Sequence, residues 1–208
     1  NQPAIGSAYL IFGGPNGMCA GNDTIVLDEH LYENALDSTE PSVIRFMGKE
    51  HLDYLGSALD FVPDIDGDGL SEIVLGAQGN DDSTFQAGAA YVVYSGDLMG
   101  TTPSESLDSL AHLKLVGASQ SEKLGFVVSG ADIDGDGKSD ILLGNPNYSA
   151  NGQNGGRVQI VFGNSIPIAS SVQNVNSIAE MTIIGNDAYD EAGTFLGNAG
   201  DLDSDGDD

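Results

Sequence analysis

The chain has 208 residues, enough for one large β domain, or part of one, with a substantial core. It carries 32 acidic and only 6 basic residues, which gives a formal net charge of -26 at pH 7. This charge argues against nucleic acid or an anionic membrane as a partner, because both require positive charge on the protein. No stretch of the sequence is long and apolar enough to span a membrane.

The first predicted strand is the apolar segment 6–12, and its pattern recurs at 88–94 and 156–162. A long loop follows from Gly13 to Val43, in which Asp28 to Leu36 can form a turn or two of helix. Two more apolar segments recur with it: one ends at 46–48, 115–117 and 183–185, and the other begins at 55–56, 124–125 and 192–193. The chain is therefore read as a repeat with four short strands in each unit.

The apolar pattern of these strands indicates how the units pack. Neither 9–12 nor 91–94 alternates between apolar and polar residues, so both faces of these strands must be covered. Four-stranded antiparallel sheets meet this need when they stack face to face, as in a β-propeller. We therefore predict an all-β fold of propeller blades that meet through the strands at Tyr9, Tyr91 and Gln159.

Each unit also contains an acidic, glycine-containing loop that precedes an apolar run. These loops begin at Asp64, Asp132 and Asp201, at intervals of 68 and 69 residues (132 − 64 and 201 − 132). Carboxylates at the first, third, fifth and ninth positions of such a loop can converge on one hard cation, and Ca²⁺ accepts six to eight oxygens in flexible geometry. An acidic turn that binds nothing is the alternative, and the recurrence of the same Asp spacing argues against it.

A helix-flanked calcium loop does not fit this sequence. That motif needs a bidentate Glu at its twelfth position, which falls here on Leu75 and Leu143. Both leucines lie in runs typical of strands, so the loop is predicted to lie within a β-hairpin and to use Glu72 or Asp140 at its ninth position.

The predicted cofactor is Ca²⁺. The first site comprises Asp64, Asp66, Asp68, the Leu70 carbonyl and Glu72; the second comprises Asp132, Asp134, Asp136, the Lys138 carbonyl and Asp140. The third loop, with Asp201, Asp203, Asp205 and Asp207, is expected to bind weakly or not at all in this chain because its ninth-position ligand is missing. Calcium either only stabilises the hairpins or also regulates binding.

The order of these motifs resembles the FG-GAP repeat of integrin α-subunit propellers, and still more that of large bacterial surface and secreted proteins. Leu-Gly replaces Phe-Gly at 55–56 and 124–125, and the GAP position reads Gly76-Ala77-Gln78 or Gly144-Asn145-Pro146. The resemblance implies a seven-bladed propeller with calcium between the first two strands of several blades. It also implies adhesion or ligand binding, or service as one domain of a larger enzyme.

About three blade equivalents cannot close such a ring, so we expect 1–208 to be a fragment of a longer propeller, and the start at Asn1 to reflect excision or processing. The expected divisions are 1–48 (end of a first blade with its long loop), 49–117, 118–185 and 186–208 (start of a fourth). Open edges and uncovered blade faces would make the isolated piece prone to self-association.

We expect an extracellular or cell-surface recognition module with no catalytic activity of its own. Cys19, His30, His51 and His112 are dispersed, and metal ligation occupies the most plausible acid/base pairs. The loops 79–86 and 148–155 are candidates for contacting a protein or glycan ligand, or are ordinary solvated loops. The alternative function is a non-catalytic propeller domain of a larger secreted hydrolase.

Overall fold

A computed structural model describes residues 5–11, 43–98, 104–150 and 152–200 of the chain. Its strands are β1 (Ser7–Ile11), β2 (Val43–Met47), β3 (Leu55–Pro63), β4 (Ser71–Ala77), β5 (Ala89–Val93), β6 (Ser104–Ser106), β7 (Leu113–Val116), β8 (Val127–Ala131), β9 (Asp140–Asn145), β10 (Arg157–Val161), β11 (Ser171–Asn174) and β12 (Met181–Ile184). The helical elements are α2 (Leu107–Leu110) and the 3₁₀ turns η1 (Ser95–Leu98), η2 (Gly163–Ser165) and η3 (Val175–Ser177). The all-β prediction is confirmed.

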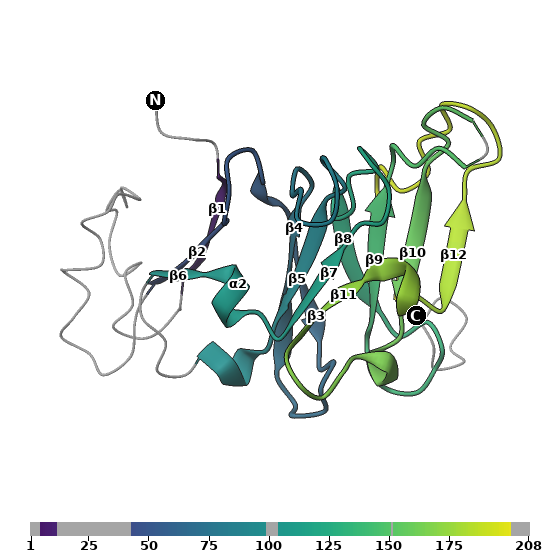
Figure 1. Ribbon diagram of the computed structural model, residues 1–208. Helices are drawn as coiled ribbons and strands as arrows, with labels where there is room; N and C mark the ends of the chain where they lie inside the picture. Colours follow the sequence, from purple (N-terminus) through teal and green to yellow (C-terminus); the bar gives the residue numbers. More distant parts are fainter. Residues whose placement is uncertain (1–4, 12–42, 99–103, 151, 201–208) are drawn as a thin grey trace, which may run out of the picture.

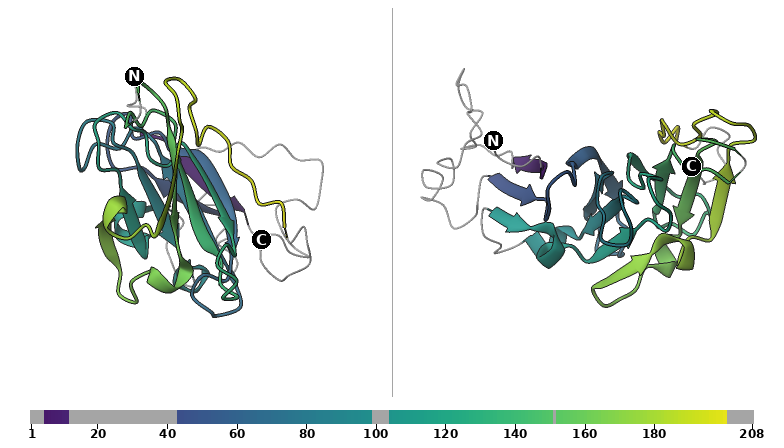
Figure 2. Two further views of the ribbon diagram at one scale, coloured as in Figure 1. Left: turned by 90° about the vertical axis from the view of Figure 1, so that its right-hand side faces the viewer. Right: turned by 45° about the horizontal axis from the view of Figure 1, so that its top comes forward.

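The strands form three sheets that follow one another in chain order across the molecule (Figure 1; Figure 2, right). The second sheet contains the antiparallel series β3-β4-β5-β7, and the third contains β8-β9-β10-β12. The first contains the antiparallel pair β1-β2. Four-stranded antiparallel blades are therefore present as predicted, and 73–75 and 141–143 lie in strands β4 and β9.

Two apolar clusters hold the sheets together. One lies between the second and third sheets and includes Val74, Val92 and Ile141; the other lies between the first and second and includes Phe46 and Tyr91. The middle sheet is thus covered on both faces, which explains why all five residues of β5 are buried. Tyr91 and Gln159 are both 1% exposed, as expected for blade contacts, whereas Tyr9 is half-buried.

Neighbouring blades approach closely through glycines. A Cβ added at Gly76 would lie 2.0 Å from the Gly125 carbonyl oxygen, and one at Gly144 would lie 2.1 Å from that of Gly193. A backbone carbonyl cannot move aside as the end of a flexible side chain can, so any Cβ at these two strand positions would clash. Both positions therefore require glycine.

One feature of the fold differs from the sequence prediction. The connection between the third and fourth strands of a blade adds a short parallel strand to the preceding blade: β6 pairs with β2, and β11 pairs with β7. We call β6 and β11 the strap strands. They are too short and too polar for the sequence to predict them as strands. Their pairing partners also lie in another repeat, so no hairpin pattern marks them.

The segment 28–36, where a turn of helix was expected, lies outside the described residues. Within the described ranges, no helix is long and apolar enough to cross a membrane. The repeat boundaries and the seven-bladed ring remain predictions.

Candidate metal centre

The first acidic loop joins β3 to β4 and closes through its own backbone. The Asp64 N–H donates to the Leu70 carbonyl at 3.0 Å. Asp64, Gly67 and Gly69 have positive φ angles of 37°, 86° and 87°. Glycine adopts this region without a Cβ penalty and Asp tolerates it, so the sequence favours a turn tight enough to gather its carboxylates.

Each loop brings three of its four predicted carboxylates together. Asp64, Asp66 and Glu72 offer oxygens that all lie within 4.8 Å of one another, and a second such group comprises Asp132, Asp134 and Asp136. Asp68 and Asp140 lie in the same loops but outside these two groups. The Leu70 carbonyl accepts one hydrogen bond and keeps a second lone pair for a cation.

Backbone amides of the loops hold the carboxylates in matching ways in the two repeats. The hydrogen bonds that show this run from Gly69 N to Asp64 (3.0 Å), Leu70 N to Asp68 (2.7 Å), Gly137 N to Asp132 (2.9 Å) and Lys138 N to Asp136 (2.8 Å). Each bond occupies one carboxylate oxygen, so the carboxylates keep acceptor capacity for a cation.

The ninth-position acids are fully buried at or next to the start of the second strand of each blade. Glu72 and Asp140 are both 0% exposed, and each accepts a hydrogen bond from the loop, from Ile65 N at 2.6 Å and Ile133 N at 2.8 Å. Asp140 also accepts from Gly163 N at 3.0 Å. Oε1 of Glu72, by contrast, is buried and lacks a hydrogen-bond partner within the described residues.

Burial raises the pKa of Glu72 to about 7; the amide of Ile65 opposes this, and the neighbouring loop carboxylates add to it. Burial likewise raises the pKa of Asp140, against the amides of Gly163 and Ile133. Both shifts have the same cause: a carboxylate removed from water beside other carboxylates favours its neutral form. A bound cation would reverse this balance.

The donor set fits a hard divalent cation. The ligand atoms are carboxylate and carbonyl oxygens, which suit Ca²⁺ and Mg²⁺ rather than thiol- or imidazole-preferring metals. The strongest observation in favour of a cation is Oε1 of Glu72, which is buried and has no hydrogen-bond partner within the described residues.

The remaining candidate residues either lie outside the described part of the chain or lie away from these two loops. Asp201, Asp203, Asp205 and Asp207, together with Cys19 and His30, lie outside the described residues. His51 is exposed. His112 stacks on Tyr94 at 3.9 Å between ring centroids, and its Nε2 lies 2.9 Å from the Pro167 carbonyl, a structural environment.

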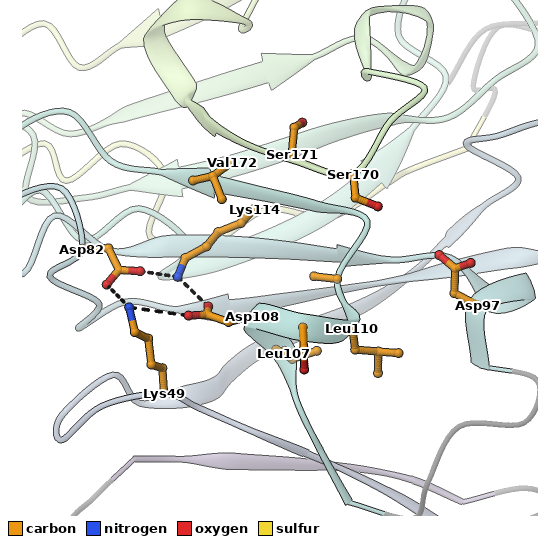
Figure 3. Close-up of a pocket in the computed structure, with 12 residues that line it drawn as sticks. Lys49, Asp82, Asp97, Leu107, Asp108, Leu110, Lys114, Ser170, Ser171 and Val172 are labelled. Atoms are coloured by element: carbon orange, nitrogen blue, oxygen red, sulfur yellow. Dashed lines mark hydrogen bonds and ion pairs between the residues drawn. The ribbon is translucent and has the colours of Figure 1, made fainter.

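Sequence reasoning missed a charged cluster that lines a cavity of about 720 Å³ beside α2 and β11 (Figure 3). The Lys114 ammonium contacts Asp82 and Asp108 and lies 4.9 Å from the Tyr91 ring centroid, while Lys49 bridges the same two aspartates. Burial lowers the pKa of Lys114, but the carboxylate hydrogen bonds outweigh it and raise the pKa overall, so this lysine remains charged. A lysine within the apolar run 113–116 was the available signal.

The FG-GAP repeat family matches the chain at residues 55–93 and 124–161. The chain contains two FG-GAP repeats. They span β3 to β5 and β8 to β10, so each includes one acidic loop. Each match begins at a Leu-Gly pair, which opens β3 in the first repeat and precedes β8 in the second. The second and third sheets of this chain therefore each contain one FG-GAP repeat.

Two curated proteins that are similar to this chain are phosphatidylinositol-glycan-specific phospholipases D. The rat protein is 32% identical over 147 residues, which cover 69% of this chain and 16% of the relative. The Dictyostelium discoideum protein is 25% identical over 132 residues, which cover 63% of this chain and 14% of the relative. The chain thus spans less than a fifth of the length of either protein.

Proposed function

We propose that this FG-GAP domain is an extracellular, calcium-stabilised recognition module without catalytic activity of its own. The observation that carries the proposal is the pair of equivalent loops, each with converging carboxylates and a fully buried acid at the ninth position. Calcium bound there would neutralise repulsion among the carboxylates and fix the hairpin between the first two strands of the blade.

The same loops explain the proposed location. Calcium-binding modules of the extracellular type bind at roughly 10⁻⁴–10⁻³ M, so extracellular calcium would fill them and resting cytosolic calcium would not. The high negative charge of the chain would then be partly offset by the bound ions.

The candidate recognition surface lies at the opposite end of the blades. Strands alternate in direction within a blade, so the acidic loops lie at one end of the blades. The β4–β5 connection and the connections that link successive blades lie at the other end. In Figure 1 the connection after β12 is at the top. Exposed aromatic side chains occur there: Tyr54, Phe85 and Tyr189. Aromatic residues are enriched at protein interfaces, which favours a protein or glycan ligand at this end.

The second candidate function is a non-catalytic propeller domain of a larger secreted hydrolase. The two relatives favour it, since both carry the name of a phospholipase D and match this chain over a small part of their length. In that setting the aromatic loops would position the substrate or a second domain, and catalysis would lie elsewhere.

Calcium titration of the chain by calorimetry tests the metal assignment. Asp134→Ala should remove one binding event and lower stability in calcium by about 1.4 kcal/mol when free calcium is about ten times Kd, a Tm shift of about 3–6 °C, but change little in excess chelator. Asp81→Ala, an exposed carboxylate outside the acidic loops, is the control. Equal losses with and without chelator would show that the carboxylate matters for a reason other than metal.

The role is tested with the full-length protein in two assays. The first is a binding screen against proteins and glycans with Phe85→Ala and Tyr189→Ala, which should weaken binding. The second is a phosphodiesterase assay of the propeller alone and of the whole protein. Turnover by the propeller alone would overturn the non-catalytic assignment.

A further inference from the structure

The turn after the third strand of a blade lies against the acidic loop of the same blade. In the third sheet this turn is η2, and its first residue, Gly163, donates its N–H to Asp140 at 3.0 Å. A Cβ at Gly163 would lie 2.7 Å from the Ser139 carbonyl, so the turn and the loop are in direct contact.

The next residue of this turn reaches into the loop. Nδ2 of Asn164 donates to Oδ2 of Asp136, the fifth-position carboxylate, across 28 residues of sequence. Oδ1 of the same carboxylate accepts from Lys138 N at 2.8 Å. Both oxygens of Asp136 are therefore held, one from within the loop and one from outside it.

We propose that Asn164 is a positioning residue for calcium in the loop 132–140: its amide orients the Asp136 carboxylate and raises the affinity of this site. The inference rests on the proposed function, namely that the loop binds calcium. A carboxylate oxygen has more than one lone pair, so Oδ2 can accept this hydrogen bond and still ligate. Outer partners that orient a metal ligand are typically worth about 10- to 100-fold in metal affinity.

The preceding blade supplies a natural comparison. At the repeat interval of 68 residues, Gly96 in η1 corresponds to Asn164. The fifth-position carboxylate of that loop, Asp68, has the matching bond from Leu70 N at 2.7 Å, but glycine provides no side chain to hold its other oxygen. The two loops thus share the inner hydrogen bond and differ in the outer one.

Gly96 can accept a side chain. A Cβ there would lie 3.6 Å from Oδ2 of Asp68, an ordinary van der Waals contact, and its φ is outside the left-handed region. Both Gly96 and Asn164 are exposed, so substitution at either position leaves the core untouched. The missing contact can therefore be added to one loop and removed from the other.

The test measures calcium affinity of one loop at a time by calorimetry in the full chain. Loop 132–140 is isolated by Ala substitution of Asp64, Asp66, Asp201 and Asp203, and loop 64–72 by Ala substitution of Asp132, Asp134, Asp201 and Asp203. In these backgrounds Asn164→Ala should weaken the first site about tenfold, and Gly96→Asn should tighten the second by a similar factor. Asn164→Leu, which has a similar shape and no charge but cannot donate, should weaken binding at least as much as Asn164→Ala.

The Tm in excess chelator distinguishes calcium positioning from a purely structural role of Asn164. Under that condition the Tm of Asn164→Ala should lie within about 1 °C of the Tm of its parent. An unchanged calcium Kd in Asn164→Ala, an unchanged calcium Kd in Asn164→Leu, or an equal Tm loss with and without calcium would each overturn the positioning role. If the unsubstituted chain binds no calcium, the proposed function itself fails, and that result is distinct from all three.

Discussion

At the scale of single residues, Lys114 places a positive charge inside an apolar strand. Its side chain is 6% exposed and its ammonium contacts Asp82 and Asp108, whose side chains are 24% and 30% exposed. Removing one partner of a buried ion pair is costly because the other charge remains desolvated.

Lys114→Met keeps the aliphatic stem and removes the charge. We expect it to lower the free energy of unfolding by about 2–3 kcal/mol, below the range for fully buried pairs because water reaches the two aspartates. Urea denaturation in excess calcium measures this. Lys49→Met is the matched control, and its exposed ion pairs should contribute under about 1 kcal/mol. Equal effects of the two substitutions would contradict this account.

Asp82 gives this cluster a dependence on pH. Burial raises the pKa of Asp82, but hydrogen bonds and charge from Lys114 and Lys49 outweigh it, so the pKa is lowered overall. A lowered pKa means stability that is present above the unfolded value of about 3.9 and lost as pH falls through the folded value. Asp82→Asn should therefore destabilise the chain at pH 7.

The difference in Tm between Asp82→Asn and the parent should shrink progressively below about pH 4, where the parent carboxylate also becomes neutral. Thermal unfolding from pH 3 to pH 8 measures it. A constant difference over that range would mean that the charge of Asp82 does not contribute.

At the scale of elements, the hairpin that contains an acidic loop is expected to depend on calcium for its order. Without a cation the carboxylates repel one another, and burial raises the pKa of Asp140. Lys138 makes this testable, because it is one of 6 basic residues and lies inside the loop 132–140.

Trypsin should cut after Lys138 at least several-fold faster in excess chelator than in millimolar calcium. Lys114 and Arg157, which are 5% and 4% exposed, should resist cleavage in both conditions. Mass spectrometry of the fragments identifies the cut, and Lys138→Gln should abolish it. The same rate with and without calcium would show that the ion does not order this hairpin.

At the scale of the whole molecule, cohesion depends on how closely the sheets stack. Gly76 of β4 and the Gly125 backbone set the approach between the second and third sheets. Gly76→Ala would force a Cβ against a carbonyl oxygen, so the sheets must shift apart. We expect a loss of about 1–3 kcal/mol, the usual cost of overpacking.

Gly197→Ala is the control for this substitution, since no described atom lies within 4 Å of its added Cβ and its φ is outside the left-handed region. Denaturant unfolding of both variants in calcium provides the comparison. If Gly76→Ala were as stable as Gly197→Ala, the close approach of the blades would not limit packing.

The sequence by itself determined the blades and the acidic loops. Strand periodicity, the glycines of the turn and the spacing from Asp132 to Asp140 are all encoded in contiguous residues, so local chemistry was sufficient to predict them. The recurrence of that pattern at 68-residue intervals then predicted the stacking of equivalent units.

Only the tertiary structure decided which residues far apart in the sequence meet. The strap strand β11 pairs with β7 of the preceding blade, Lys114 reaches Asp82 across 32 residues, and Asn164 reaches Asp136 across 28. No local pattern marks these contacts, because each depends on the register between strands and on the path of a connection. That register is fixed by the shape of the packed core rather than by the residues that meet across it.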